Sequence, residues 1–241
     1  DCRAMIAAAQ ESDKVLMVGH NMRTEPSHIL AKKLLTDGAI GRVLSFHAVA
    51  ANDGPENWSA KKSFDTWFYR EDEATYGSIG DLGVHKIDLM RFLLEDEIVE
   101  VRAVLASLDK AGMSGLSISV DDYATCILRT QKGVVGSVTS AWNFYADQDY
   151  STVIQGTEGV MKIYCDASGP LVVAGRDGSR AVYDPAERML GEERDSGLIE
   201  EFATCIEQNK RPSIGGEDGL ASVRVLECCV ESARSGRAVS V

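Results

Sequence analysis

Hydrophobic residues in the first forty positions change period twice, which predicts a helix, a buried strand and a second helix. Met5, Ile6, Ala8 and Ala9 recur at helical spacing. The run from Lys14 to Gly19 is continuously apolar and ends in glycine, as in a strand buried on both faces of a parallel sheet. A helix is then expected from Thr24 or Glu25, with Pro26 in its first turn, to a Gly38 cap. Residues 1–40 are therefore predicted to be a piece of a parallel α/β unit.

After Gly41 the hydrophobic period becomes that of strands. Strand-like runs are expected at 42–49, 98–107, 123–130, 134–142, 151–155, 160–164, 171–174 and 181–183. Several are separated by short turns that contain glycine, such as 131–133 and 176–178, and strands joined by tight turns pair antiparallel. Helices are expected at 83–94, 198–208 and 219–235. The fold class predicted for residues 41–241 is α+β, a large open, mainly antiparallel sheet with helices on one face.

Composition and charge narrow the class of partner. The 241 residues are 44% hydrophobic and 26% charged, as in an ordinary globular protein, and the net charge is −12. An acidic surface repels phosphate backbones and anionic lipids, so we expect no nucleic acid and no membrane partner. No apolar run approaches the roughly 20 residues that span a bilayer, and residues 1–14 do not resemble a signal peptide; a cytoplasmic location is expected. Six scattered cysteines indicate free thiols rather than a disulfide framework.

The segment from Tyr76 to Met90 carries the densest chemistry in the chain. Glycines precede a predicted helix on which Asp81, His85 and Asp88 stand at i, i+4 and i+7, which places them on one face. Carboxylates beside an imidazole can fix its tautomer and raise its pKa toward the working pH, as general acid–base catalysis requires. Two other interpretations stay open. Asp81 can cap the helix while His85 is an interior histidine, or the pair can share a cation, although no further ligands stand at a recognisable spacing.

The same segment, GSIGDLGVHKIDLMRFLL at 77–94, resembles the signature of the glucose–fructose oxidoreductase, inositol dehydrogenase and MocA family, a glycine pair followed by D-x-G-x-H-x-x-D and an apolar helix. Other segments resemble the family in the same order: VLMVGHNMR at 15–23, LTDGAIGRV at 35–43, VIQGTEGVMKI at 153–163, and the closing helix and strand at 218–239. The resemblance spans essentially the whole chain.

The resemblance implies the second half of a two-domain oxidoreductase. Residues 1–40 would be the end of a dinucleotide-binding Rossmann domain, and residues 41–241 a substrate-binding and oligomerisation domain, a homodimer or homotetramer through its sheet. The implied cofactor is NAD or NADP, and the implied substrate is a secondary alcohol or ketone of a sugar or polyol. The catalytic roles carry over to Asp81, which would orient the imidazole, and to His85, the proton acceptor. The family's E-K-P lysine and G-x-G-x-x-G loop do not occur here, so we expect these 241 residues alone to be inactive.

Further site residues are expected from their positions. The substrate-binding candidates are Arg23, Arg70, Asp88, Trp142 and Asn143. His20 and Asn21 are candidates for contact with the cofactor, because they follow the predicted buried strand at the end where open α/β sheets bind ligands. No metal site is expected. Four aromatic residues ahead of the motif could stack on a sugar or belong to the core: Trp58, Trp67, Tyr69 and Tyr76.

Two other functions are weighed against the oxidoreductase. The first is a non-enzymatic module of the same fold that binds sugar or forms dimers. The second is a metal-dependent lyase or hydrolase that uses Asp81 and His85.

Overall fold

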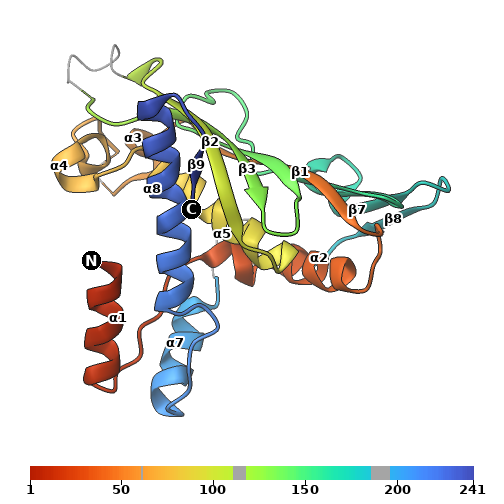
Figure 1. Cartoon of the computed structure of the whole chain (residues 1–241), viewed down its shortest axis with the longest axis horizontal. Helices are drawn as coiled ribbons and strands as arrows, with labels where there is room; N and C mark the ends of the chain where they lie inside the picture. Colours follow the sequence, from red (N-terminus) through yellow and green to blue (C-terminus); the bar gives the residue numbers. More distant parts are fainter. Residues whose placement is uncertain (61, 111–117, 186–195) are drawn as a thin grey trace.

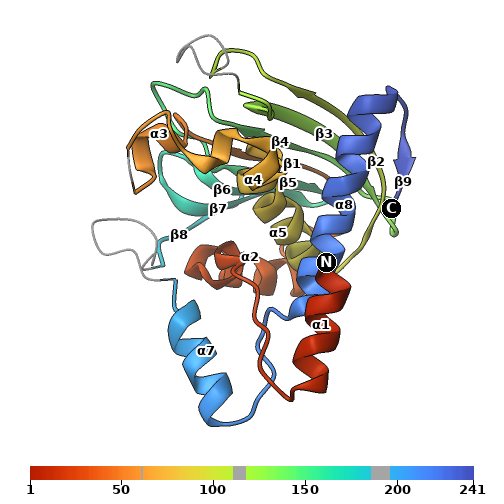
Figure 2. The same ribbon diagram turned by 90° about the vertical axis from the view of Figure 1, so that its left-hand side faces the viewer.

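The computed structural model of the chain describes residues 1–60, 62–110, 118–185 and 196–241. Its centre is a nine-stranded sheet in the order β8-β7-β6-β5-β1-β4-β3-β2-β9 (Figures 1 and 2). The strands are β1 (Val43–Ala51), β2 (Ile98–Ala106), β3 (Tyr123–Thr130), β4 (Val135–Ala141), β5 (Thr152–Gly156), β6 (Gly159–Asp166), β7 (Gly169–Gly175), β8 (Arg180–Tyr183) and β9 (Val239–Ser240). All neighbours pair antiparallel except β1 and β4, which are parallel. The predicted α+β class and mainly antiparallel sheet are confirmed.

Helices cover one face of this sheet. Figure 2 shows α2 (Pro26–Thr36), α5 (Val84–Leu94) and α8 (Gly216–Ser235) beneath the strands. Their apolar side chains join those of the inward sheet face in one core, which includes Ile87, Leu226 and Phe46. Gly136 in β4 leaves room for the Phe46 ring, because a Cβ there would lie 2.4 Å from it. The opposite face of the sheet carries exposed apolar side chains, including Val104, Ile127 and Val135.

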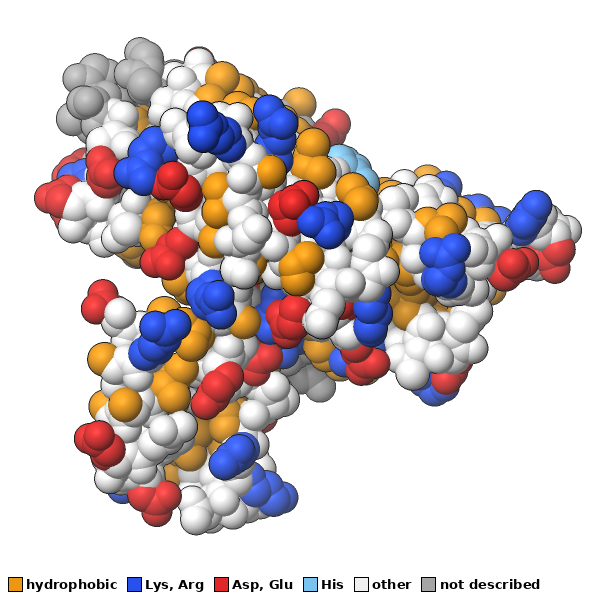
Figure 3. Space-filling model, in the orientation of Figure 1, with side chains coloured by type: hydrophobic (Ala, Val, Ile, Leu, Met, Phe, Trp, Pro, Cys, Tyr) orange, Lys and Arg blue, Asp and Glu red, His pale blue; other side chains and the backbone are white. Residues whose placement is uncertain are grey.

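Two helices protrude below the sheet at the same end of the molecule. They are α1 (Cys2–Glu11) and α7 (Leu198–Glu207), and both have exposed hydrophobic side chains, among them Met5 and Ile199. Hydrophobic side chains are visible on this protruding part in the space-filling view (Figure 3).

The buried strand predicted at 14–19 is wrong. Met17 forms a single antiparallel bridge with Gly215, and the apolar residues of the segment are only half-buried. Leu16 and Val18 pack on glycines of α8, at Gly216 and Gly219. A strand forms only where a neighbouring strand accepts and donates its backbone hydrogen bonds. Among the described residues this segment has one bridge partner, so most of its length is unpaired.

Short helical elements that the hydrophobic pattern does not reveal complete the fold. They are η1 (Asn21–Thr24), α3 (Pro55–Trp58), η2 (Trp67–Tyr69), α4 (Glu71–Ala74) and η3 (Ile79–Gly83). Each spans three to five residues, too few for a periodic pattern to register. The six cysteines are free thiols, as expected.

His28 in α2 makes the stability of the fold sensitive to acid. Its Nδ1–H donates to the carbonyl of Met22 at 2.7 Å, and its ring meets Tyr164 edge to face. Its Nε2 is buried and has no hydrogen-bond partner in the described ranges. Burial and the charge of Lys86, against the hydrogen bond to Met22, lower the pKa of His28 to about 3. Between this pKa and about 6.5, the unfolded chain binds a proton that the folded chain does not. The free energy of unfolding must therefore fall as the pH falls through this interval.

His28→Asn is expected to flatten that dependence. Between pH 7 and pH 4.5 the variant should lose about 2 to 3 kcal/mol less of its free energy of unfolding than the unmodified chain. Urea denaturation at the two pH values measures this difference. His47→Asn is the matched control, because His47 is exposed on β1. Equal losses in the His28 variant and the unmodified chain would contradict the assignment.

Candidate functional site

The helix that carries the D-x-G-x-H-x-x-D motif is held at its start by a single carboxylate. Asp121 accepts hydrogen bonds from the backbone N–H of Gly77 and Ile79, at 3.1 and 2.9 Å, and from the Ser78 hydroxyl at 2.7 Å. The chain passes so close that a Cβ at Gly77 would lie 1.9 Å from the Asp121 carbonyl oxygen. The first turn, η3, is a π-helix, and α5 continues from it without a break. Asp121 thus takes the role of an N-cap from outside the helix.

Asp81 lies in the π-helical turn and bonds to Trp142. The indole Nε1–H of Trp142 donates to the Asp81 Oδ2 at 3.0 Å. Trp142 directly follows β4 and is fully buried. Burial raises the pKa of Asp81 to about 6, although the hydrogen bond from Trp142 acts in the opposite direction. Asp81 therefore changes charge close to neutral pH, which is a property of groups that transfer or stabilise protons.

His85 lies against a second histidine. The rings of His85 and His20 meet edge to face, with 5.5 Å between centroids. The Nδ1 of His85 is buried and has no hydrogen-bond partner among the described residues. Burial, together with the charges of His20 and Lys86 and against that of Asp88, lowers the pKa of His85 to about 4. This direction is opposite to the predicted one, because burial outweighs the attraction of the carboxylate and because Asp81 bonds to Trp142.

His20 contributes two more buried ring nitrogens next to His85. Neither Nδ1 nor Nε2 has a partner in the described part of the chain. The Nε2 lies 3.6 Å from the Asp88 Oδ1, which is too long for a hydrogen bond. Burial lowers the pKa of His20, while Asp88 counteracts it. The predicted cofactor residue and the predicted catalytic residue are thus brought together as two neutral imidazoles, and Asn21 follows His20 at the start of η1.

Asp88 and Arg23 are paired with each other. The guanidinium Nε and Nη2 of Arg23 each donate to one oxygen of Asp88 at 2.6 Å, and Nη2 also reaches Asp218 at 3.0 Å. Asp88 is 1% exposed and further accepts from the Ser222 hydroxyl. Arg91 lies 3.7 Å from the same carboxylate. This network anchors α5 to η1 and α8, one helical turn beyond His85.

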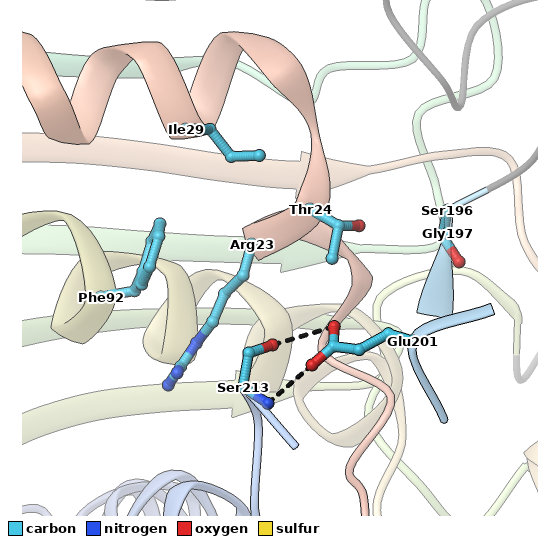
Figure 4. Close-up of a pocket in the computed structure, with 8 residues that line it drawn as sticks. All are labelled: Arg23, Thr24, Ile29, Phe92, Ser196, Gly197, Glu201 and Ser213. Atoms are coloured by element: carbon cyan, nitrogen blue, oxygen red, sulfur yellow. Dashed lines mark hydrogen bonds between the residues drawn. The ribbon is translucent and has the colours of Figure 1, made fainter. Parts of the chain in front are cut away.

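Arg23 also borders a cavity of about 330 Å³ (Figure 4). Its other walls include Phe92 of α5 and Glu201 of α7, and Glu201 accepts hydrogen bonds from the backbone and hydroxyl of Ser213. Neither Asp81 nor His85 lines this cavity. Arg23 therefore borders a cavity distinct from the surroundings of Asp81 and His85, while its guanidinium is bound to Asp88 and Asp218.

Two of the predicted substrate residues lie elsewhere. Arg70 forms surface ion pairs with Asp65, at 3.0 Å, and with Glu73. Asn143 follows Trp142, and its Nδ2 is 3.4 Å from Asp122. The structure does not bring Arg70 to Asp81 and His85. Asn143 is next to the site in the chain, but its side chain points to Asp122.

Lys86 is a site neighbour that the sequence reasoning missed. Its Nζ is fully buried and donates to the Tyr150 carbonyl at 2.7 Å, to Thr152 Oγ1 at 3.0 Å and to the Ser151 carbonyl at 3.3 Å. Burial lowers its pKa to about 7. The signal was present in the pattern, because Lys86 shares helical spacing with Met90 and Leu93 on the apolar side of α5.

No group of three or more His, Cys, Asp or Glu side chains in the described ranges is arranged to hold a metal ion. Among the same residues, no helix is both long enough and apolar enough to cross a membrane.

Comparison with known proteins identifies the class and then the family. The fold is that of solved oxidoreductases: a levoglucosan dehydrogenase in complex with NADH and levoglucosan superposes with a TM-score of 0.83 at 28% identity, over 100% of this chain and 70% of that one. Residues 28–162 match the model of the GFO/IDH/MocA C-terminal domain. The chain belongs to the GFO/IDH/MocA family, as its motifs predicted.

Curated relatives of the chain include sugar and polyol dehydrogenases, and also 2,7-anhydro-N-acetylneuraminate hydratase from Mediterraneibacter gnavus, which is 29% identical over 78% of this chain and 48% of the relative. Levoglucosan dehydrogenase from Pseudarthrobacter phenanthrenivorans is 32% identical over 217 residues, which are 80% of this chain and 54% of the relative. Inositol 2-dehydrogenase from Rhizobium meliloti is 27% identical over 99% of this chain and 69% of the relative. The chain thus spans about half to two thirds of the length of these relatives.

Proposed function

We propose that the protein containing this chain is an NAD(P)-dependent oxidoreductase that acts on a secondary alcohol or ketone of a sugar or polyol. The observation that carries the proposal is the contact between two buried neutral imidazoles, His20 and His85, with three ring nitrogens that have no hydrogen-bond partner among the described residues. Asp81, one helical turn before His85, has a pKa of about 6. Buried polar atoms without partners cost stability, so their presence points to a ligand that completes them. The similarity to sugar and polyol dehydrogenases supports the choice of ligand.

In this proposal His85 takes the proton of the substrate hydroxyl. Its depressed pKa keeps the imidazole neutral and able to accept at physiological pH. Asp88, whose charge raises the pKa of His85, would stabilise the charge that forms on the ring. Asp81, one helical turn before His85 and held by the Trp142 indole, is a second group of the site that can take up a proton.

The family implies a nicotinamide dinucleotide, which accepts or supplies the hydride when bound. His20 and Asn21 are the residues here that would approach it, since the orphan ring nitrogens of His20 fit a polar ligand group. The preference between NAD and NADP is left open. Trp142 would position Asp81 through its hydrogen bond, and Arg23 and Asp88 would hold the helix in place, whereas the Asn143 side chain points to Asp122.

We further propose that the protein is a homodimer or homotetramer through its sheet. The support is the uncovered sheet face, on which Val104, Ile127 and Val135 are exposed. Apolar side chains clustered on an open face are typical of subunit interfaces.

The test is an assay of the natural protein that contains this chain. With levoglucosan, myo-inositol and neutral aldoses as substrates, and NAD or NADP as acceptor, we expect reduced nicotinamide to form with at least one combination. No reduction with any combination, in a protein whose melting temperature either nucleotide raises, would overturn the proposed chemistry. We expect the 241 residues alone, which contain no G-x-G-x-x-G motif, to show little change in melting temperature.

A further inference from the structure

Lys86 is a buried cation one residue after His85 that has no role in the function proposed above. Its side chain is 0% exposed. The Nζ lies 2.7 and 3.3 Å from the carbonyl oxygens of Tyr150 and Ser151, and 3.0 Å from Thr152 Oγ1. An ammonium group has three N–H donors, and the three acceptors match them one for one. The surroundings of Lys86 are therefore built for the charged form of the lysine.

In the described part of the chain, no carboxylate pairs with this charge. The acceptors around the Lys86 Nζ are two backbone carbonyls and a hydroxyl. Asp149, which attracts the ammonium through space, accepts a hydrogen bond from the backbone N–H of Ser151 at 2.8 Å. A buried cation without a paired carboxylate costs stability, and an apolar side chain of similar length would avoid this cost. A charge retained at such a position points to a role in function.

The three hydrogen bonds tie α5 to the start of β5, which begins at Thr152. Figure 2 shows α5 beneath this part of the sheet. The tie extends to β1, because the Val49 N–H donates to the Ser151 carbonyl at 2.9 Å. The Nδ1 of His85, by contrast, has no hydrogen-bond partner among the described residues. The His85 ring is thus placed by its helix and its ring neighbours, and Lys86 fixes the helix at the adjacent residue.

The charge of Lys86 acts on two histidines. It opposes protonation of His85 in α5 and of His28 in α2, whose pKa values are about 4 and about 3. Burial lowers the pKa of Lys86 itself to about 7, so the ammonium is charged throughout the range in which both histidines titrate. At His85, the charge of His20 also opposes protonation, whereas that of Asp88 favours it. Lys86 therefore counteracts Asp88 at the imidazole.

Other charged groups near this helix are engaged with partners of their own. Asp81 in η3 accepts the hydrogen bond from Trp142. Arg23 in η1 donates to Asp88 and to Asp218 of α8. Lys86 differs from these groups, because its hydrogen bonds go to the sheet and leave its charge free to act on the neighbouring imidazole.

We propose that Lys86 is a positioning residue for proton transfer at His85: it ties the helix to β5 and keeps a positive charge near the imidazole. The inference rests on the proposed function for the role of His85. The positive charge disfavours the imidazolium, so a proton that His85 takes from the substrate hydroxyl is released again readily. The tie holds the ring in place, and small displacements of a catalytic group are costly for the rate.

The protonation of His85 in the natural protein tests the charge without turnover. Histidine labelled with ¹³C at Cε1 gives one ring signal per residue in NMR spectra, and His85→Asn identifies the signal of interest. With a pKa of about 4, about one tenth of His85 is protonated at pH 5. In Lys86→Met, which removes the charge and keeps the length of the side chain, we expect about one fourth to one half.

Thr152→Val is the matched control for this measurement. It removes one of the three acceptors and perturbs the same buried contact, but Lys86 stays charged at pH 5. The protonated fraction of His85 should therefore stay near one tenth. A rise in Lys86→Met alone separates the effect of the charge from a local disturbance of packing.

Steady-state kinetics of the natural protein tests the tie. At pH 8, where His85 is neutral in every variant, we expect Lys86→Met to lower kcat about tenfold and to change KM less than about twofold. Lys33→Met removes an exposed lysine of α2 and should leave kcat unchanged.

The outcomes separate this proposal from the function on which it rests. An unchanged protonated fraction in Lys86→Met, an equal rise in Thr152→Val, or an unchanged kcat of Lys86→Met in an active protein would each overturn the role of Lys86. If Lys86→Met does not fold, Lys86→Gln, which is uncharged and keeps two N–H donors, is measured by the same criteria. A rise confined to the uncharged Lys86 variant, in a protein without redox activity, would support the effect of the charge and refute the oxidoreductase.

Discussion

Replacing His85 with alanine in the natural protein is expected to reduce turnover by about 10²- to 10⁴-fold, the usual contribution of a positioned general base. His85 is a neutral imidazole whose buried Nδ1 has no hydrogen-bond partner among the described residues. Alanine removes the proposed proton acceptor, while the hydrogen bond from Trp142 to Asp81 stays in place. Affinity for NAD(P) should change little, because the variant removes a group on the substrate side. Steady-state rates and nucleotide titrations measure the two quantities.

The pH profile supplies a second measure of the same site. Because the pKa of His85 is lowered to about 4 and that of Asp81 is raised to about 6, Asp81 rather than His85 titrates near pH 6, one unit below Lys86. We expect kcat/KM to rise with pH through about 6, and this rise to disappear in Asp81→Asn. His47→Ala is the control for loss of an exposed histidine. Full turnover in His85→Ala would refute the catalytic assignment.

Asp88→Ala is expected to lower the free energy of unfolding by about 3 to 5 kcal/mol, the cost of removing one partner of a buried ion pair. The 1% exposed carboxylate of Asp88 receives two hydrogen bonds from Arg23 and lies 3.7 Å from Arg91. Without it, two largely buried guanidinium groups are left with Asp218 and Glu97 as their counter-charges among the described residues. Denaturant unfolding followed by tryptophan fluorescence reports the loss.

Asp37→Ala is the matched control for Asp88→Ala. Asp37 pairs with Lys33 on the exposed side of α2, and surface pairs of this kind contribute less than about 1 kcal/mol. Similar small losses in both variants would show that the Asp88 network is not a buried ion pair in solution. Asp88→Asn should lie between the two, since an amide keeps one acceptor for Arg23.

Most of the strands were predictable, because alternation and turn residues are local signals. The sequence placed β3 at its observed bounds and β2 within one residue, and the glycines at 133 and 178 have the positive φ that their turns require. The long helices α7 and α8 were found for the same reason. The motif residues Asp81, His85 and Asp88 were also visible, since they stand at helical spacing in an otherwise apolar stretch.

What the sequence did not reveal depends on contacts between distant segments. The pairing of His20 with His85 joins η1 to α5, and the Trp142 bond to Asp81 joins the end of β4 to η3. Neither follows from periodicity. The pKa of His85 was expected to rise on the basis of nearby carboxylates, but burial is a property of the packed molecule and lowers it. The segment at 14–19 has the composition of a buried strand, yet composition does not supply a neighbour to pair with.

The place of β1 in the sheet also constrains the order of folding. This strand lies between β4 and β5, which come much later in the chain, and Ser45 pairs with Val135 on one side and Gln155 on the other. Contacts between distant segments must wait for the loop between them to close, and they slow folding. During synthesis, β1 therefore leaves the ribosome long before either partner exists. Its apolar residues need protection from aggregation until residue 156 has emerged, so production of this protein should depend strongly on chaperones.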